Sequence, residues 1–267
     1  MNAKQHYEAG NLREALEAAT DEVRGHPTDT AQRGFLAELL CFSGEFERAD
    51  RQLDTIGQQE PQAMVGVSMY RQLIRAEMAR QQFFTEGRLP EFLDKPSPAI
   101  QIYLEASIEL REGDAPKAAQ RLEEVEQQRF HVSGRCDGEP FDDLRDLNDL
   151  TAACLEVLTS NGKYYWIPIE KVESIELHPP KRPRDLIWRG ARMVVDQGPD
   201  GEVFLPTLYP NTHASDDDKL RLGRATDWIG GDDSPAQGVG LRTFLVGEGD
   251  RTILQINQIE FDARAGQ

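Results

Sequence analysis

A repeated unit of 34 residues constrains the fold of this chain more than any other feature of its sequence. Gly10, Ala15 and Pro27 recur, each shifted by 34 residues, as Gly44, Ala49 and Pro61. The glycine permits a left-handed turn between two helices. The alanine allows the second helix to pack closely, and the proline ends that helix because it has no N–H to donate. The unit therefore predicts a pair of α-helices joined by a tight turn.

A 34-residue period of paired helices is typical of tetratricopeptide arrays. Two complete hairpins are predicted, with helices at about 2–9, 12–25, 29–43 and 46–58. A longer helix is expected across about 62–86, as a third unit whose glycine has drifted to Met78. A final hairpin is expected at about 98–128, where Gly113 and Ala118 are again five residues apart. These elements define a predicted tetratricopeptide-like α-helical repeat domain over residues 1–128.

The chain changes character after residue 128. Residues 129–162 are predicted to be a connecting segment with a helix across about 141–159. The apolar side of that helix would carry Leu144, Leu147, Leu150, Cys154, Leu155 and Leu158. Residues 163–267 predict a small mostly-β domain, because short apolar and aromatic runs alternate there with glycine- and proline-containing turns.

The β region contains about six expected strands. They lie at 163–168, 172–177, 188–195, 202–206, 240–247 and 252–261, and residues 247–250 form a hairpin turn between the last two. Strands of this length and spacing favour a compact barrel or rolled sheet. The predicted fold class is therefore α+β, with a helical-repeat domain followed by the β domain.

Charge and composition exclude several classes of protein. The net charge is −17, and a surface of this sign repels phosphate backbones, so nucleic-acid binding is not expected. The densest basic stretch, Lys181-Arg182-Pro183-Arg184, is interpreted as a solvated loop. The chain has no apolar run of the roughly 20 residues that span a bilayer and no signal-peptide pattern at its start. The three cysteines lack a CxxC spacing, which favours a reducing, cytoplasmic location without disulfides.

No catalytic or cofactor motif stands out, and neither a cofactor nor a metal is predicted. The chain lacks HExxH, GxSxG, Walker and GxGxxG patterns, and its five histidines are scattered. Asp216-Asp217-Asp218, near His213, could offer carboxylates to a hard cation. The run lacks the central glycine and bidentate glutamate of a calcium loop, so a solvated acidic loop is the favoured interpretation. We therefore do not expect an enzyme.

Stacked helix pairs expose a concave inner face built from the first helix of each pair, and such a face can bind a partner. Alignment of the units on Gly10 and Gly44 places six candidate partner-binding residues near it: Gln5, Glu8, Glu38, Phe42, Gln72 and Arg75. Phe42 would be an apolar anchor for an amphipathic helix, whose register Glu38 and Arg75 would fix. The alternative is that Phe42 is a core residue between helices.

A second group of side chains leaves another function open. The β region carries the aromatic residues Tyr164, Tyr165, Trp166, Tyr209 and Trp228. Most aromatic residues in a β domain form the core, but Tyr and Trp can also line a binding groove. A small-ligand pocket or enzyme site between the domains would draw on Tyr164, Trp166, Tyr209, Trp228 and Arg242. A scaffold that acts only through oligomerisation is a third reading.

Seven strings of the sequence carry a family resemblance. One lies in the amino-terminal part, at Leu36–Ala49, but strings of this kind are widespread in helical-repeat proteins. Six more specific strings lie in the β region, at Leu155–Leu158, Gly162–Pro168, Arg184–Arg189, Leu205–Pro210, Leu220–Trp228 and Gly238–Leu245. Together they resemble the ImpE/TagJ family, also called SciE, accessory proteins of bacterial type VI secretion systems. The sequence departs from the family pattern before Leu155, where an expected acidic run reads Arg145-Asp146-Leu147-Asn148-Asp149.

The resemblance implies a cytoplasmic, non-enzymatic adaptor with a role in virulence. Its implied partner is the small subunit of the contractile sheath (TssB/VipA-like), bound through an amphipathic helix of that subunit. An influence on sheath assembly, or on disassembly by a ClpV-type AAA+ ATPase, follows indirectly from that contact. The family supplies no catalytic residues that could be carried over to this chain.

Overall fold

The computed structural model describes residues 1–231 and 233–263. Two helical hairpins form its amino-terminal end, with helices α1 (Ala3–Ala9), α2 (Leu12–Gly25), α3 (Thr30–Phe42) and α4 (Phe46–Gln59). Gly10 and Gly44 turn the chain with φ values of +90° and +75°, where a side chain would be strained. Ala15 and Ala49 are both 0% exposed. The turning and packing roles predicted for these repeated positions are confirmed.

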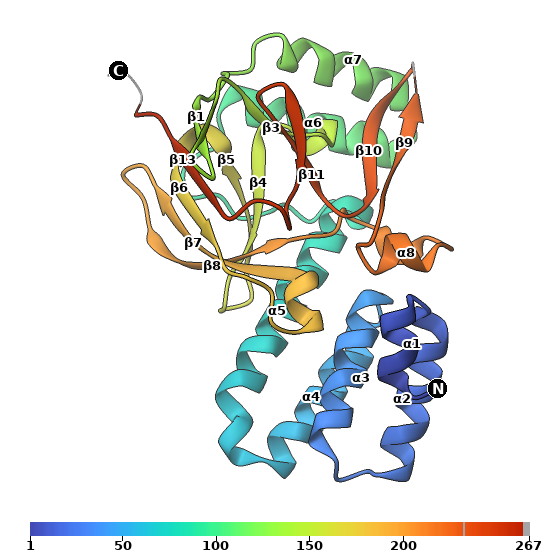
Figure 1. The fold of residues 1–267 in the computed structure, drawn as a ribbon. Helices are drawn as coiled ribbons and strands as arrows, with labels where there is room; N and C mark the ends of the chain where they lie inside the picture. Colours follow the sequence, from blue (N-terminus) through green and yellow to red (C-terminus); the bar gives the residue numbers. More distant parts are fainter. Residues whose placement is uncertain (232, 264–267) are drawn as a thin grey trace.

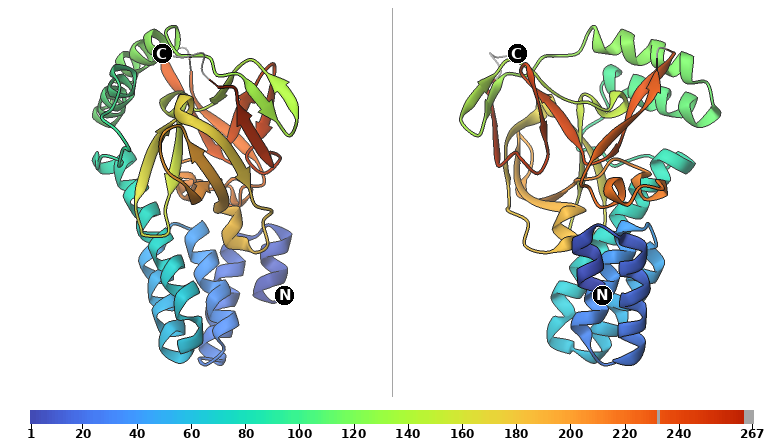
Figure 2. Two further views of the ribbon diagram at one scale, coloured as in Figure 1. Left: turned by 90° about the vertical axis from the view of Figure 1, so that its left-hand side faces the viewer. Right: turned by 45° about the vertical axis from the view of Figure 1, so that its right-hand side comes forward.

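A single long helix connects the hairpins to the rest of the molecule. A short 3-10 turn, η1 (Pro61–Ala63), leads into α5 (Met64–Glu86), which is 23 residues long and ends at Gly87 with φ +81°. In Figure 1 this helix leaves the four-helix end and reaches the sheet. A last hairpin, α6 (Pro98–Glu112) and α7 (Ala115–Glu126), lies beside the β region (Figures 1 and 2). The long helix and the final hairpin agree with the prediction.

The carboxy-terminal part is mostly β. Its elements are β1 (Gly134–Cys136), β2 (Glu139–Phe141), β3 (Leu144–Asp146), β4 (Cys154–Leu158), β5 (Tyr164–Pro168), β6 (Val172–Leu177), β7 (Trp188–Val195), β8 (Asp200–Pro206), α8 (Asp218–Arg221), β9 (Thr226–Gly231), β10 (Ser234–Gly240), β11 (Thr243–Val246), β12 (Gly249–Thr252) and β13 (Gln258–Phe261). Eight strands form one sheet in the order β2-β1-β13-β6-β7-β8-β4-β5. Two smaller sheets are β12-β11-β3 and β10-β9.

The helix predicted across 141–159 is wrong. This stretch forms β3, a 3-10 turn (η2, Asp149–Thr151) and β4. All five residues of β4 are buried because the strand lies between β5 and β8 and is covered on both faces. A short, fully apolar run gives the same periodicity in a buried strand as in a buried helix. The spacing of the leucines therefore could not separate the two.

The expectation of about six strands is too low for the described residues. The run 252–261 is interrupted at 253–257 and contributes to two strands, β12 and β13. The short strands β1 to β3 lie in the segment predicted to be a connection. The ribbon of β9 and β10 contains four glycines, at positions 230, 231, 238 and 240, which weakens its strand signal. The hairpin turn at 247–250 is confirmed, since Val246 pairs with Gly249.

Two apolar clusters support the fold, and the first joins the helices to the sheet. It contains residues of every helix from α1 to α7 together with Leu158, Trp166, Trp188 and Leu208 of the β part. The second lies within the β part alone. β4 contributes Cys154 and Leu158 to the first cluster, and Leu155 and Val157 to the second. The helical and β parts are therefore packed on each other through a continuous core.

Candidate functional site

Buried charges connect α5 to the sheet. Arg80 on α5 is 2% exposed, and its guanidinium donates to the Glu156 carboxylate on β4 at 2.9 and 3.0 Å. It also donates to Glu77 Oε1 at 2.9 Å and to the carbonyl of Leu208 at 3.0 Å. Glu77 accepts a further bond from the indole N–H of Trp188 at 2.8 Å. Every one of these polar groups is buried, so the bonds fix the position of α5 against the sheet.

The network continues through Arg242 into the second half of the β part. Arg242 pairs with Glu156 and, at 2.9 Å, with Asp146 Oδ2. Asp146 also accepts from the hydroxyl of Tyr209 at 3.0 Å. Burial alone would raise the pKa of the Glu156 carboxyl, but Arg80 and Arg242 outweigh burial and lower that pKa to about 2. Glu156 is therefore a carboxylate that compensates two buried arginines.

These contacts occupy the place where the alternative hypothesis expects a ligand pocket. The Tyr164 hydroxyl donates to Glu156 at 2.5 Å and accepts from the indole N–H of Trp166 at 2.5 Å. Tyr164, Trp166, Tyr209 and Arg242 are each at most 3% exposed. The cavity beside Arg80 and Tyr209 has a volume of about 20 Å³, which is close to the size of one water molecule.

Trp228 is the exception among the five pocket candidates. It lies on β9, is 41% exposed and contacts the Tyr209 ring at a centroid distance of 5.6 Å. Four of the five candidates are therefore buried, with polar groups bonded to Glu156, Asp146 or one another, and a ligand-binding role for the five residues stays a prediction.

The inner face of the helical array is partly covered by the chain itself, and an open space of about 490 Å³ remains between α1, α3 and residues 180–186. A 3-10 turn, η4 (Pro183–Leu186), packs against α3. The Arg184 guanidinium lies 5.0 Å from the ring centre of Tyr70 on α5, and Trp188 contacts the same ring at 5.9 Å. Within the basic stretch, Arg184 is thus an interdomain contact, whereas Lys181 and Arg182 are exposed, as expected of a solvated loop.

Two of the predicted partner-binding residues are covered by this contact. Phe42 is 1% exposed and packs on Tyr7 at a centroid distance of 6.1 Å. As placed, it cannot anchor a partner, and the core alternative holds. Glu38 faces η4, where burial raises the pKa of its carboxyl to about 7 although Arg184 and Arg182 act in the opposite direction.

The other four candidates are spread over separate places. Gln5 is exposed and completes the capping box of α1 with Asn2. Glu8 is exposed on the same helix. Gln72 lies against Gly162, at the turn between β4 and β5, and Arg75 is exposed on α5. The structure does not bring the six residues together as one surface, and a binding role for these four stays a prediction.

One segment of the β part, residues 213–224, contacts the turns of both hairpins. The Arg224 guanidinium donates to the carbonyls of Tyr7 and Glu8 at the end of α1, at 2.5 and 3.0 Å. Asp218 Oδ2 accepts from the backbone N–H of Leu12 at 2.7 Å. This carboxylate caps α2, whose own N-cap residue makes no side-chain bond.

The turn glycines are in contact with the same segment. A Cβ at Gly44 would collide with the His213 ring, and one at Gly10 would meet Arg224. The repeated glycines therefore serve the docking of the β part as well as the turn itself. The acidic run at 216–218 supplies helix caps, because Asp217 also caps α8. Within the described residues, no group of three or more His, Cys, Asp or Glu is arranged to hold a metal ion.

Sequence reasoning missed the residues of this docking interface. Glu77 and Arg80 continue the spacing of Leu73 and Ile74 on the apolar face of α5, and such charged residues in a core pattern signal a buried pair. Glu156 gives the same signal inside the apolar run of β4. No local signal announces Asp218, since the helix that it caps lies more than 200 residues away in the chain.

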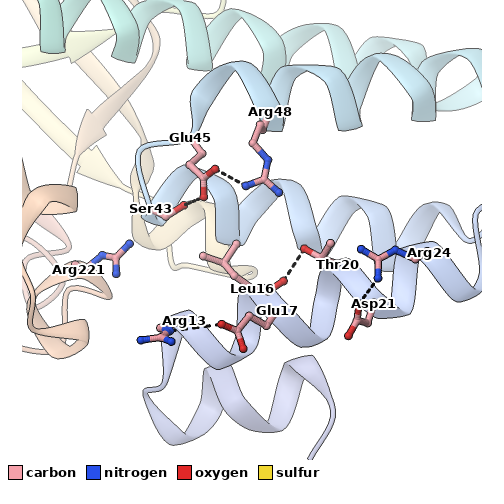
Figure 3. A pocket seen from close by; sticks show the side chains of 10 residues that line it. All are labelled: Arg13, Leu16, Glu17, Thr20, Asp21, Arg24, Ser43, Glu45, Arg48 and Arg221. Carbon is pink, nitrogen blue, oxygen red and sulfur yellow. Dashed lines mark hydrogen bonds and ion pairs between the residues drawn. The ribbon is translucent and has the colours of Figure 1, made fainter.

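On the opposite side of the array, a groove of about 760 Å³ lies open between α2 and α4 (Figure 3). The lining side chains come from α2, from the start of α4 and from α8: Arg13, Leu16, Glu17, Thr20, Asp21, Arg24, Ser43, Glu45, Arg48 and Arg221. In Figure 3, Arg221 approaches the groove from α8, apart from the two helices that form its walls. This groove was not predicted from the sequence.

Comparison with known proteins identifies the family. The family described as "ImpE protein" matches residues 138–260. The chain is also 31% identical over 262 residues to the "Type VI secretion system accessory component TagJ" of Pseudomonas aeruginosa, covering 98% of this chain and 92% of the relative. This chain belongs to the ImpE/TagJ family. The resemblance inferred from the β-region strings is therefore confirmed.

A solved structure shares the whole fold of this ImpE/TagJ family member. The crystal structure of protein VPA1032 from Vibrio parahaemolyticus superposes with a TM-score of 0.91, at 26% sequence identity and with 98% of each chain covered. The strings that carried the family resemblance lie at the interface described above. Trp166, Trp188, Leu208, Arg224 and Arg242 each belong to one of them. The strings that are most specific to the family therefore contribute residues to the interface between the helices and the sheet.

None of the helices in the described residues is long and apolar enough to cross a membrane.

Proposed function

We propose that this chain is an accessory component of a type VI secretion system and acts as a non-enzymatic, cytoplasmic adaptor. The observation that carries the proposal is the 31% identity to the TagJ accessory component over 98% of the chain. The buried network supports the absence of catalysis at the interface, because Arg80, Glu156 and Arg242 bond to one another and not toward an open cavity.

Its partner in this proposal is the small, TssB/VipA-like subunit of the contractile sheath, bound through an amphipathic helix. Helical hairpins that are turned by a repeated glycine support a tetratricopeptide-like array, an architecture that often holds segments of other proteins. Through that contact the adaptor would influence sheath assembly, and indirectly the disassembly of the sheath by a ClpV-type AAA+ ATPase.

Capture of the purified sheath subunit by the immobilised full-length chain tests this function. The subunit is offered in two forms, complete and without its candidate helix. We expect the complete form to be retained and the shortened form to be lost. Equal retention of both forms would remove the helix from the mechanism, and retention of neither would contradict the adaptor role.

A further inference from the structure

The groove between α2 and α4 has the shape of a site for another helix. Its wall on α2 is one stripe of residues at alternating intervals of three and one: Arg13, Leu16, Glu17, Thr20, Asp21 and Arg24. This spacing marks a single helix face, and it runs from the first to the last turn of the 14-residue helix. At 1.5 Å per residue the wall is about 20 Å long, enough for several turns of a guest helix.

The groove is richer in arginine than the rest of this acidic chain. Four arginines and three carboxylates line it, whereas the whole chain has a net charge of −17. The arginines have partners, but only a few donors are used. Arg13 donates through Nε to Glu17 Oε1 at 3.4 Å, and Arg24 donates through Nη1 to Asp21 Oδ1 at 2.8 Å. A guanidinium has five N–H donors, so most of the binding capacity of these side chains faces solvent.

Arg221 adds an observation that does not depend on the charge count. It comes from α8 in the β part, and its Nη1 forms an ion pair with Asp218 Oδ1 at 3.1 Å. Its Nε is buried and has no hydrogen-bond partner among the described residues. An unsatisfied buried donor is costly. Since this Nε is itself closed to the groove, a carboxylate entering this end would meet the guanidinium ends of Arg13, Arg48 and Arg221 that line it.

The remaining side chains select among anionic partners. Glu17, Asp21 and Glu45 alternate with the arginines (Figure 3), so they would repel a uniform polyanion such as a nucleic acid. Leu16 is half-buried on the floor of the groove and offers an apolar contact. An apolar floor between charged walls matches an amphipathic helix with separated carboxylates.

We propose that this groove, and not the inner face of the array, holds the amphipathic helix of the sheath small subunit, with acidic side chains of that helix beside Arg13, Arg48 and Arg221. The inference rests on the proposed function. On the inner face Phe42 is buried, and the open space there, about 490 Å³ beside Tyr7, Phe35 and Leu186, is smaller than the outer groove. The outer groove is continuous along α2 and is open to solvent.

Charge reversal on the exposed walls tests the location. Arg13 and Arg48 are 79% and 46% exposed at the side chain, so the double variant Arg13→Glu/Arg48→Glu will keep its fold. Binding of the purified sheath subunit is measured by biolayer interferometry for the full-length chain and for the variant. We expect Kd to rise by about tenfold or more in the variant, and the salt dependence of binding to fall.

Arg192→Glu is the control, because Arg192 is 57% exposed on strand β7 and the change reverses the charge of one arginine outside the groove, half of the charge change in the double variant. It should bind like the unmodified chain, and both variants should melt within a few degrees of it. Binding by the double variant as tight as by the control would overturn the groove assignment while leaving the adaptor role intact. A loss of binding that is equal in the control would also overturn the assignment. No binding by the unmodified chain would instead contradict the proposed function.

Discussion

The two faces of the helical array differ in what covers them. On the inner face, Phe42 is buried, Glu38 faces η4, and Arg184 of η4 lies against the Tyr70 ring. On the outer face, between α2 and α4, Arg13, Arg24 and Arg48 are exposed and each uses few of its donors. Both faces arise from the same repeated hairpin. The comparison teaches that a repeat determines the shape of an array, while the domain packed on it determines which face stays available to a partner.

The largest effect is expected from a change in the buried charge network that joins α5 to the sheet. Glu156→Ala would leave Arg80 and Arg242 without their shared carboxylate in the core. Breaking a buried ion pair by removing one partner costs about 3–5 kcal/mol. Urea unfolding should therefore show a decrease of that size in the free energy of unfolding. A loss below about 1 kcal/mol would mean that the two arginines are solvated, and the closed interface would be wrong.

The variant Phe42→Ala distinguishes a core role of Phe42 from a role as an anchor for a partner. Removal of a buried phenylalanine ring leaves a cavity and costs roughly 3 kcal/mol or more. We expect thermal and urea unfolding of the variant to reflect this loss. An exposed anchor would behave in the opposite way, with stability unchanged and only binding of the sheath subunit weakened. Phe42→Leu, which keeps most of the apolar volume, is the matched milder change and should cost less.

Glu38 makes the closed face sensitive to pH. Burial, opposed by Arg184, raises the pKa of its carboxyl to about 7 in the folded chain, above the value of about 4.3 of an unperturbed glutamate. Between these two values the folded state binds more protons at this site, so its contribution to stability falls as pH rises. Glu38→Gln should match the unmodified chain near pH 4 and exceed it at pH 8. The excess should be about 1 kcal/mol, after a discount for the partial exposure of the site.

A pH titration of urea midpoints measures that difference. If the two chains differ by the same amount at pH 4 and pH 8, Glu38 titrates normally. It would then face solvent, and the inner face would be more open than the structure indicates.

Asp218→Ala sharpens the comparison at the edge of the array. The change removes the carboxylate that caps α2 from the β part and should cost about 1 kcal/mol, as other lost caps do. Asp216→Ala is the matched control, because Asp216 is exposed, and we expect a change within about 0.5 kcal/mol. Circular dichroism during urea unfolding gives both values. Equal effects of the two changes would contradict the distant cap.

The sequence predicted the helices well because their signals are local. The shared positions of Gly10 and Gly44, the prolines after each hairpin and the apolar periodicity of α5 each act within a few residues. Strand β4 was missed because the spacing of its leucines fits a buried strand and a buried helix equally well, and β3 because it is only three residues long. The position of the site was harder to predict from the sequence, because it depends on residues that are far apart in the chain. Phe42 and Arg184 lie 142 positions apart in the numbering, and only the folded chain shows that η4 covers the face on which Phe42 lies.

The sequence did contain one clue to the buried network, namely charged residues within apolar patterns. Arg80 and Glu156 each interrupt a run of core residues, and their pairing follows once α5 is known to lie on β4. The outer groove could not be predicted in the same way. Arg221 reaches it from a four-residue helix whose position depends on the whole β part.

Protection of single introduced thiols by the sheath subunit tests the central contrast most directly. The native thiols Cys41, Cys136 and Cys154 are all buried, so a cysteine placed at Thr20 in the groove or at Gln5 near the inner rim would report alone. With saturating sheath subunit, we predict slowed alkylation at position 20 and unchanged alkylation at position 5. Protection at position 5 with free reaction at position 20 would place the partner on the inner side and contradict the account.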